Sequence, residues 1–202
     1  MNIENTHIAF VGPQGSGKST LAEMLEQRRL SPYTVIPIAQ AIRNTAVLAY
    51  GEDFDKTKSY TQRRLGLDIE VSGREILQDI GAQLRELDAS FWIKAWHAEF
   101  LRFQGNGKPI VVDDVRLPLE AHWLRHHVPG ITIVRVHATA EARTERRGSL
   151  QGASDVTEFG YLQTEYDLEI DTTGLTPEDS YAILQRHLVE NGKWLASAVE
   201  ES

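Results

Sequence analysis

The chain has 202 residues, which suits a single domain able to bury a core, and its 41% hydrophobic and 25% charged residues are typical of globular proteins. It has no cysteine, which excludes disulfides and thiolate metal sites, and its net charge of −8 disfavours binding of nucleic acid on a basic surface. No apolar run approaches the ~20 residues that span a bilayer, and no signal-peptide pattern opens the chain. We therefore expect a cytoplasmic protein without membrane or nucleic acid partners.

Predicted strands and helices alternate along the chain. Short apolar and β-branched runs predict strands at 7–12, 33–39, 110–115, 131–138 and 168–172. Helical spacing of apolar residues, with capping and glycine signals, predicts helices at 18–29, 40–50, 73–88, 91–104, 117–127 and 139–147, and a last helix that starts at Thr176. The polar stretch 51–64 is expected to form a loop or short helices. The alternation predicts a three-layer α/β/α fold with a five-stranded parallel sheet.

A glycine-rich loop follows the first predicted strand and leads into the first predicted helix. Its sequence, Gly-Pro-Gln-Gly-Ser-Gly-Lys-Ser at 12–19, matches the pattern G-x-x-x-x-G-K-[ST], in which backbone N–H groups surround phosphate oxygens. The following helix adds its positive N-terminal end. We expect Lys18 to contact the β- and γ-phosphates of ATP and Ser19 to bind Mg²⁺. The predicted ATP-binding residues here are Gly12, Gln14, Gly15, Ser16, Gly17, Lys18, Ser19 and Thr20.

The predicted strand 110–115 carries two aspartates near its end. In P-loop proteins an acidic strand end beside the phosphate loop holds the metal. Neighbouring strand residues point to opposite faces, so Asp113 and Asp114 cannot both do this. We favour Asp114 near the metal, with Arg116 beside the phosphates, because these two share a face. Asp113 is the competing choice and is otherwise assigned to the acceptor.

The predicted helix 73–88 has three faces at 100° per residue. One is apolar and one is acidic and solvated, and a third carries Arg74, Gln78, Gly81 and Arg85. A glycine inside a helix costs ~1 kcal/mol relative to alanine, and a flat group that approaches this face closely would explain it. The stripe therefore predicts a site for a phosphorylated nucleoside, the alternative being a solvated surface of ordinary arginines.

Arginines gather in the predicted helix 139–147 and precede a polar, glycine-bounded segment. Phosphoryl transfer needs positive charge around the transferring group, and a closing lid can supply it. Arg143 and Arg147 share a helix face, and Arg143 is also expected to contact ATP. Arg146 is a further candidate, and the alternative is a solvated basic helix paired with its own glutamates.

Several of these segments, in this order, resemble one known family. The loop GPQGSGKST, the run GREILQDIG at 73–81 with Arg85, and DDVRLPLE at 113–120 are similar to segments of the tailed-phage deoxynucleoside monophosphate kinases. The resemblance implies that Arg74, Gln78 and Arg85 bind the acceptor nucleotide. It also implies that Asp114 and Arg116 serve the metal and phosphates, that lid arginines close over the transferring group, and that the location is the host cytoplasm if a phage encodes the chain.

The resulting hypothesis is transfer of the ATP γ-phosphoryl group to a deoxynucleoside monophosphate. The catalytic residues would be Lys18, Asp114, Arg116, Arg143 and Arg147. The whole chain, 1–202, is expected to be one kinase domain with an acceptor-binding insertion at about 40–104 and a lid at about 143–160; the choice between monomer and homodimer is open. The alternatives are a related small-molecule kinase, such as one acting on dephospho-coenzyme A, and a non-enzymatic nucleotide-binding switch.

Overall fold

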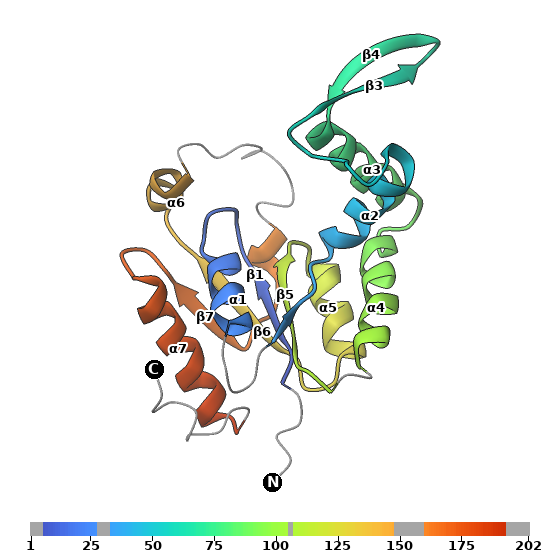
Figure 1. Ribbon diagram of the computed structural model, residues 1–202. Coiled ribbons are helices and arrows are strands. Elements are labelled where there is room, and N and C mark those ends of the chain that lie inside the picture. Colours follow the sequence, from blue (N-terminus) through green and yellow to red (C-terminus); the bar gives the residue numbers. More distant parts are fainter. Residues whose placement is uncertain (1–5, 28–32, 105–106, 148–159, 193–202) are drawn as a thin grey trace. The chain divides into compact units, whose positions relative to one another are not determined.

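The computed structural model describes residues 6–27, 33–104, 107–147 and 160–192 (Figure 1). The chain divides into two compact units. The first unit comprises Met1–Pro37 and Leu101–Ser202, and the second comprises Ile38–Phe100. Within the described ranges no helix is both long and apolar enough to cross a membrane.

The first unit is built on a five-stranded sheet. Its strands are β1 (Ile8–Val11), β2 (Thr34–Val35), β5 (Ile110–Val115), β6 (Thr132–His137) and β7 (Leu168–Asp171). Their order in the sheet is β2-β5-β1-β6-β7, and each neighbouring pair is parallel. The predicted α/β fold with a five-stranded parallel sheet is confirmed. In such a sheet all carboxyl ends lie along one edge, where ligands bind.

Helices flank this sheet. They are α1 (Lys18–Glu26), α5 (Pro118–His127), α6 (Ala140–Arg147) and α7 (Pro177–Glu190), with a 3-10 turn, η2, at Gly160–Gln163. Leu21 and Leu25 of α1 and Leu184 and Leu188 of α7 recur at helical spacing and pack in one buried cluster with alternate residues of the strands. Burial of each such leucine contributes about 2 kcal/mol. This packing fixes α1, and with it the glycine loop, against the sheet.

A buried histidine joins the starts of two neighbouring strands. His7 is 5% exposed, and its Nδ1 accepts a hydrogen bond of 3.1 Å from the backbone N–H of Ile110. Burial lowers the pKa of His7 to about 4, so its imidazole is neutral at physiological pH.

The second unit contains α2 (Ala39–Tyr50), the hairpin strands β3 (Ser59–Arg64) and β4 (Leu67–Ser72), α3 (Gly73–Leu87) and most of α4 (Phe91–Gln104). The two strands are antiparallel and form a sheet of their own. The predicted loop or short helices over 51–64 are therefore wrong from Ser59 onward. Tyr60 and Val71, on one face of the hairpin, pack with Ala46 and Ile76 of the helices. This packing stabilises two strands whose mostly polar sequence does not predict strand structure.

The start of α3 is set by a capping box. Ser72 Oγ accepts from the backbone N–H of Glu75 at 3.2 Å, and Glu75 Oε2 accepts from the backbone N–H of Ser72 at 2.8 Å. The backbone of Gly73 passes so close to Asp55 that a Cβ there would lie 2.3 Å from its carbonyl oxygen. The predicted helix 73–88 thus forms with almost the expected bounds.

Candidate active site

The glycine loop between β1 and α1 needs its glycines for two separate reasons. Gly12 has φ 152°, and a Cβ at this position would lie 1.9 Å from the carbonyl oxygen of Val136 on β6. Gly17 is the N-cap of α1 and has φ 97°, a left-handed conformation that side chains rarely adopt. The loop can therefore lie tightly against the sheet edge and turn its backbone into the helix.

Lys18, the first residue of α1, folds back over this loop. Its Nζ donates to the carbonyl oxygens of Gly12 at 2.8 Å and Pro13 at 2.7 Å. The ammonium is thus held above the turn, where a bound phosphate would meet it. Ser16, within the turn, is fully buried, and its Oγ has no hydrogen-bond partner in the part of the chain that is described.

The aspartate that contacts the glycine loop is Asp113. The Ser19 hydroxyl donates to Asp113 Oδ2 at 2.8 Å, linking α1 to the end of β5. Asp114, which the sequence favours for the metal, is the next residue of β5, at the point where the register between β5 and β1 shifts by one residue. The contact with Ser19 therefore favours Asp113, the competing choice, as the aspartate beside the metal.

The pair Ser19 and Asp113 fits a magnesium ion. Asp113 Oδ1 is buried and, among the described residues, has no hydrogen-bond partner, so the carboxylate keeps an oxygen available beside the serine hydroxyl. Mg²⁺ prefers oxygen ligands and usually takes one or two from the protein, the others coming from substrate phosphates and water. The described ranges contain no cluster of three or more acidic, histidine or cysteine side chains that could hold a metal.

Two arginines of α6 reach the glycine loop. Arg143 Nη1 donates to the carbonyl oxygen of Gln14 at 3.1 Å. Arg146 Nη1 donates to the carbonyl oxygen of Gly15 at 3.5 Å. Arg146 also donates to Thr172 twice, from Nη1 to Oγ1 at 3.0 Å and from Nη2 to the carbonyl oxygen at 2.6 Å. The start of the helix is capped as predicted, since Thr139 Oγ1 accepts from the backbone N–H of Ala142 at 3.3 Å. The side chain of Arg147, and residues 148–159 of the predicted lid, lie outside the described part.

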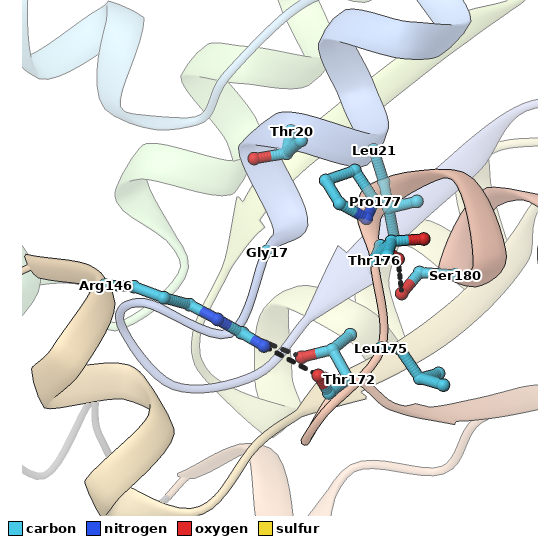
Figure 2. Close-up of a pocket in the computed structure, with 9 residues that line it drawn as sticks. All are labelled: Gly17, Thr20, Leu21, Arg146, Thr172, Leu175, Thr176, Pro177 and Ser180. Carbon is cyan, nitrogen blue, oxygen red and sulfur yellow. Dashed lines mark hydrogen bonds between the residues drawn. The ribbon is translucent and has the colours of Figure 1, made fainter.

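A pocket lies beside the glycine loop, where α1, α6 and the connection from β7 to α7 meet (Figure 2). It is lined by Gly17, Thr20, Leu21, Arg146, Thr172, Leu175, Thr176, Pro177 and Ser180. Thr172 is 4% exposed and its Oγ1 lies 3.0 Å from the carbonyl oxygen of Ser16, so this connection is tied to the loop itself. Of the lining residues, Gly17 and Thr20 were predicted to bind ATP and Arg146 was a lid candidate, whereas the residues from 172 to 180 were missed. Their position at the carboxyl end of a strand was the signal.

Arg116 follows the end of β5. Its side chain is exposed and makes no hydrogen bond or ion pair with another described residue. The backbone at this point turns into α5, where Glu120 Oε2 accepts from the N–H groups of Arg116 at 2.9 Å and Leu117 at 3.0 Å. The guanidinium is thus available to a ligand while the peptide that carries it is held.

The predicted acceptor stripe belongs to α3, in the second unit. Arg74 and Gln78 are exposed, and Arg85 is half-buried with Nη1 donating to the carbonyl oxygen of Gly81 at 3.3 Å. Gly81 is buried, and a Cβ there would meet Ile42 of α2 at 3.4 Å. This is an ordinary van der Waals distance, so packing against α2 does not by itself require a glycine at this position.

Comparisons with known proteins bear on this site. The model of a family described as an AAA domain matches residues 8–166. Among solved structures, a gluconokinase from Sinorhizobium meliloti 1021 shares 17% identity with a TM-score of 0.56, over 94% of this chain and 95% of its own. A sugar kinase from a Janibacter species shares 15% identity with a TM-score of 0.51, over 92% and 93%, and a protein from Thermus thermophilus shares 16% with a TM-score of 0.55, over 93% and 98%. No match was found among curated proteins. The structural likenesses establish the fold.

Proposed function

The chain belongs to the AAA domain family, and on that premise we propose that it is an ATP-dependent phosphotransferase acting on a small molecule. The main support for the proposal is the contact between Ser19 and Asp113 where the glycine loop enters α1. Lys18 folds over the same loop. Asp113, rather than Asp114, is assigned to the metal because its free Oδ1 is buried beside that serine. The kinase folds of the gluconokinase and sugar kinase support the same reaction class.

The loop would bind the triphosphate through backbone N–H groups. Lys18 would exchange its two carbonyl contacts for the β- and γ-phosphates, and Ser19 with Asp113 would hold Mg²⁺. When bound, the ion would neutralise negative charge on the phosphates. Arg143, which contacts Gln14 of the loop, and Arg116 would stabilise the charge that spreads over the transferring group. Arg147 is assigned the same role from its position on α6.

The donor base would lie in the pocket of Figure 2. Leu21, Leu175 and Pro177 offer apolar surface to a flat ring, and the Arg146 guanidinium, held by Thr172, can lie over its face. Gly17 and Thr20, which also line this pocket, connect it directly to the phosphate loop. A nucleoside triphosphate would therefore extend from this pocket to the metal.

For the acceptor we propose a deoxynucleoside monophosphate, bound by α3. Arg74 and Arg85 would pair with its phosphate and Gln78 would contact the base edge. A monophosphate acceptor is already ionised and needs no general base, which agrees with the engagement of Asp113 by Ser19. A hydroxyl acceptor, as in dephospho-coenzyme A, would require a base.

A coupled assay of ADP release tests the proposal. ATP and Mg²⁺ are supplied with a panel of deoxynucleoside monophosphates, ribonucleoside monophosphates, dephospho-coenzyme A, gluconate and shikimate. We expect turnover with one or more deoxynucleoside monophosphates and none in Lys18→Ala. Stimulation by gluconate, shikimate or dephospho-coenzyme A alone would overturn the acceptor assignment, and no stimulation by any compound of the panel would overturn the kinase.

Arg85→Ala tests the acceptor assignment separately. Removal of this arginine should raise the acceptor KM by roughly 10-fold or more with little change in the KM for ATP, because one charged contact to the monophosphate is lost. Arg63→Ala is a matched control, since Arg63 lies on the hairpin of the same unit with a side chain 74% exposed. An unchanged acceptor KM in Arg85→Ala would contradict the role of α3.

A further inference from the structure

The turn that presents Arg116 is held from two sides. On one side lies Glu120, a carboxylate that is only 4% exposed, in the first turn of α5. A single oxygen of it, Oε2, accepts both the Arg116 and the Leu117 backbone N–H. Burial of a carboxylate is costly unless its oxygens are paired in this way. Glu120 therefore fixes the orientation of the peptide planes around Arg116.

The arrangement differs from the caps of two other helices in the described part of the chain. In α3 and α7 the acidic residues Glu75 and Asp179 are exposed, and each accepts a hydrogen bond from the backbone N–H of the capping residue. That capping residue is a serine or a threonine, and its side chain accepts a hydrogen bond from the backbone N–H of the acidic residue. In α5 the capping position is Leu117, which has no side-chain acceptor. The Glu120 side chain accepts the backbone N–H of Leu117, and it also accepts that of Arg116, one residue before the capping position. An ordinary cap needs no such extension.

Gly160 holds the turn from the other side. It opens η2, and a Cβ at this position would lie 2.6 Å from the carbonyl oxygen of Arg116 and 3.4 Å from Pro118 Cδ. Only glycine lets the backbone of η2 rest directly on this peptide. The N–H and the C=O of Arg116 are thus both fixed, whereas its guanidinium has no described partner.

We infer that Glu120 and Gly160 are positioning residues for phosphoryl transfer: together they hold the backbone of Arg116 so that its guanidinium meets the transferring phosphoryl group. The inference rests on the proposed function, which gives Arg116 that task. A displacement of about 1 Å in a catalytic group can cost roughly 100-fold in rate, so a rigid turn has a direct kinetic value.

A double-mutant cycle tests this with the full-length chain and the acceptor that the panel selects. Arg116→Ala should lower kcat by roughly 100-fold. Glu120→Ala should lower kcat by a similar factor with little change in the KM for ATP. The double variant should be no slower than Arg116→Ala by more than about 2-fold, because Glu120 acts only through Arg116. Glu120→Gln keeps an oxygen at the same place and should recover most of the activity.

Two further variants separate positioning from stability. Gly160→Ala should lower kcat in the same way without removing any polar group. Asp88→Asn is the matched control, because Asp88 also accepts a backbone N–H, that of Ser90 at 2.9 Å, at the start of a helix, α4. It should lower the unfolding temperature but leave kcat unchanged. Hydrogen exchange of the Arg116 and Leu117 amides should accelerate in Glu120→Ala and stay slow in Glu120→Gln and Asp88→Asn.

The outcomes distinguish the two claims. Two results in a wild type that transfers phosphoryl groups would refute the positioning role and leave the proposed function standing. One is a roughly 10⁴-fold loss of kcat in the double variant, the product of the two single losses. The other is equally fast exchange of the two amides in all variants. If the wild type transfers nothing to any acceptor, the proposed function fails and the positioning role fails with it.

Discussion

At the scale of single residues, Asp113 and Asp114 stand side by side near the end of β5, and Asp113 accepts the Ser19 hydroxyl. The run 110–112 before them is buried on both faces of the sheet, as central parallel strands are, so its hydrophobicity has no alternation from which the face of each aspartate can be told. In the structure Val111 belongs to the cluster beneath α1 and α7, and Asp113, two residues later, points the same way, toward Ser19. Which aspartate contacts Ser19 depends on the elements that neighbour β5, and a local sequence pattern does not specify these.

The assignment of Asp113 to the metal has a direct kinetic test. We expect Asp113→Asn to lower kcat by roughly 100-fold and to raise the Mg²⁺ concentration at half-maximal rate, since an amide is a weaker ligand than a carboxylate. Asp114→Asn makes the same chemical change one residue later and should cost less than about 10-fold. Steady-state rates over a Mg²⁺ series measure both. A larger loss of kcat in Asp114→Asn than in Asp113→Asn would assign the metal to Asp114 instead.

At the scale of elements, the connection from β1 to α1 is constrained by the sheet as well as by its ligand. Gly12 lies against the backbone of β6, so an added methyl would have to displace Val136. We expect Gly12→Ala to lower the free energy of unfolding by about 2–3 kcal/mol through overpacking and backbone strain.

Gly107→Ala is the matched control for that change. Gly107 has φ 66°, and a Cβ there would meet no atom within 4 Å, so only strain of about 1 kcal/mol is expected. Urea unfolding of the two variants and the wild type measures the difference. Equal losses would show that the contact with β6 is unimportant.

Elements differed in how well the sequence predicted them. Four strands of the central sheet and the capped helices were predicted because their signals are local: a buried apolar run, Thr139 at the start of α6, a proline after Thr176. The strand predicted at 33–39 is shorter in the structure, where only Thr34–Val35 pairs with the sheet. The hairpin of β3 and β4 was missed because its strands are mostly polar. Its turn, Leu65-Gly66 with φ 52° and 83°, is a two-residue hairpin turn, and the alternation of Leu67, Ile69 and Val71 after it was the available signal.

At the scale of the whole molecule, the contacts that complete the site join residues far apart in the chain. Thr172 Oγ1 reaches the carbonyl oxygen of Ser16 across 156 positions, and Arg143 reaches Gln14 across 129. The alternation of strands and helices predicted that such segments share one edge of the sheet, but which side chain meets which carbonyl depends on packing that no local pattern encodes. For this reason the pocket that we propose for the donor base was not predicted.

The stability of the sheet should depend on pH through His7. Its pKa is about 4 in the folded chain, against the ordinary histidine value of 6.5 in the unfolded chain, so between these values the unfolded chain binds a proton that the folded chain does not. The contribution of neutral His7 is complete above pH 6.5 and is lost progressively as the pH falls toward 4, by roughly 3 kcal/mol in total.

His7→Asn isolates this effect, because an asparagine oxygen can still accept the Ile110 N–H but does not titrate. Urea unfolding at about pH 7 and about pH 5 should show a clearly larger loss of stability for the wild type than for His7→Asn. Equal losses in the two proteins would mean that other groups cause the acid sensitivity.

The proposed transfer of the γ-phosphoryl group of ATP to a monophosphate acceptor can be followed with a label on that group. ATP labelled in its γ-phosphoryl group is mixed with excess enzyme, Mg²⁺ and each deoxynucleoside monophosphate, and the products are separated after one turnover. We expect label in the deoxynucleoside diphosphate, and none there with Lys18→Ala. Label that remains in ATP, or appears only as inorganic phosphate, would rule out transfer to these acceptors.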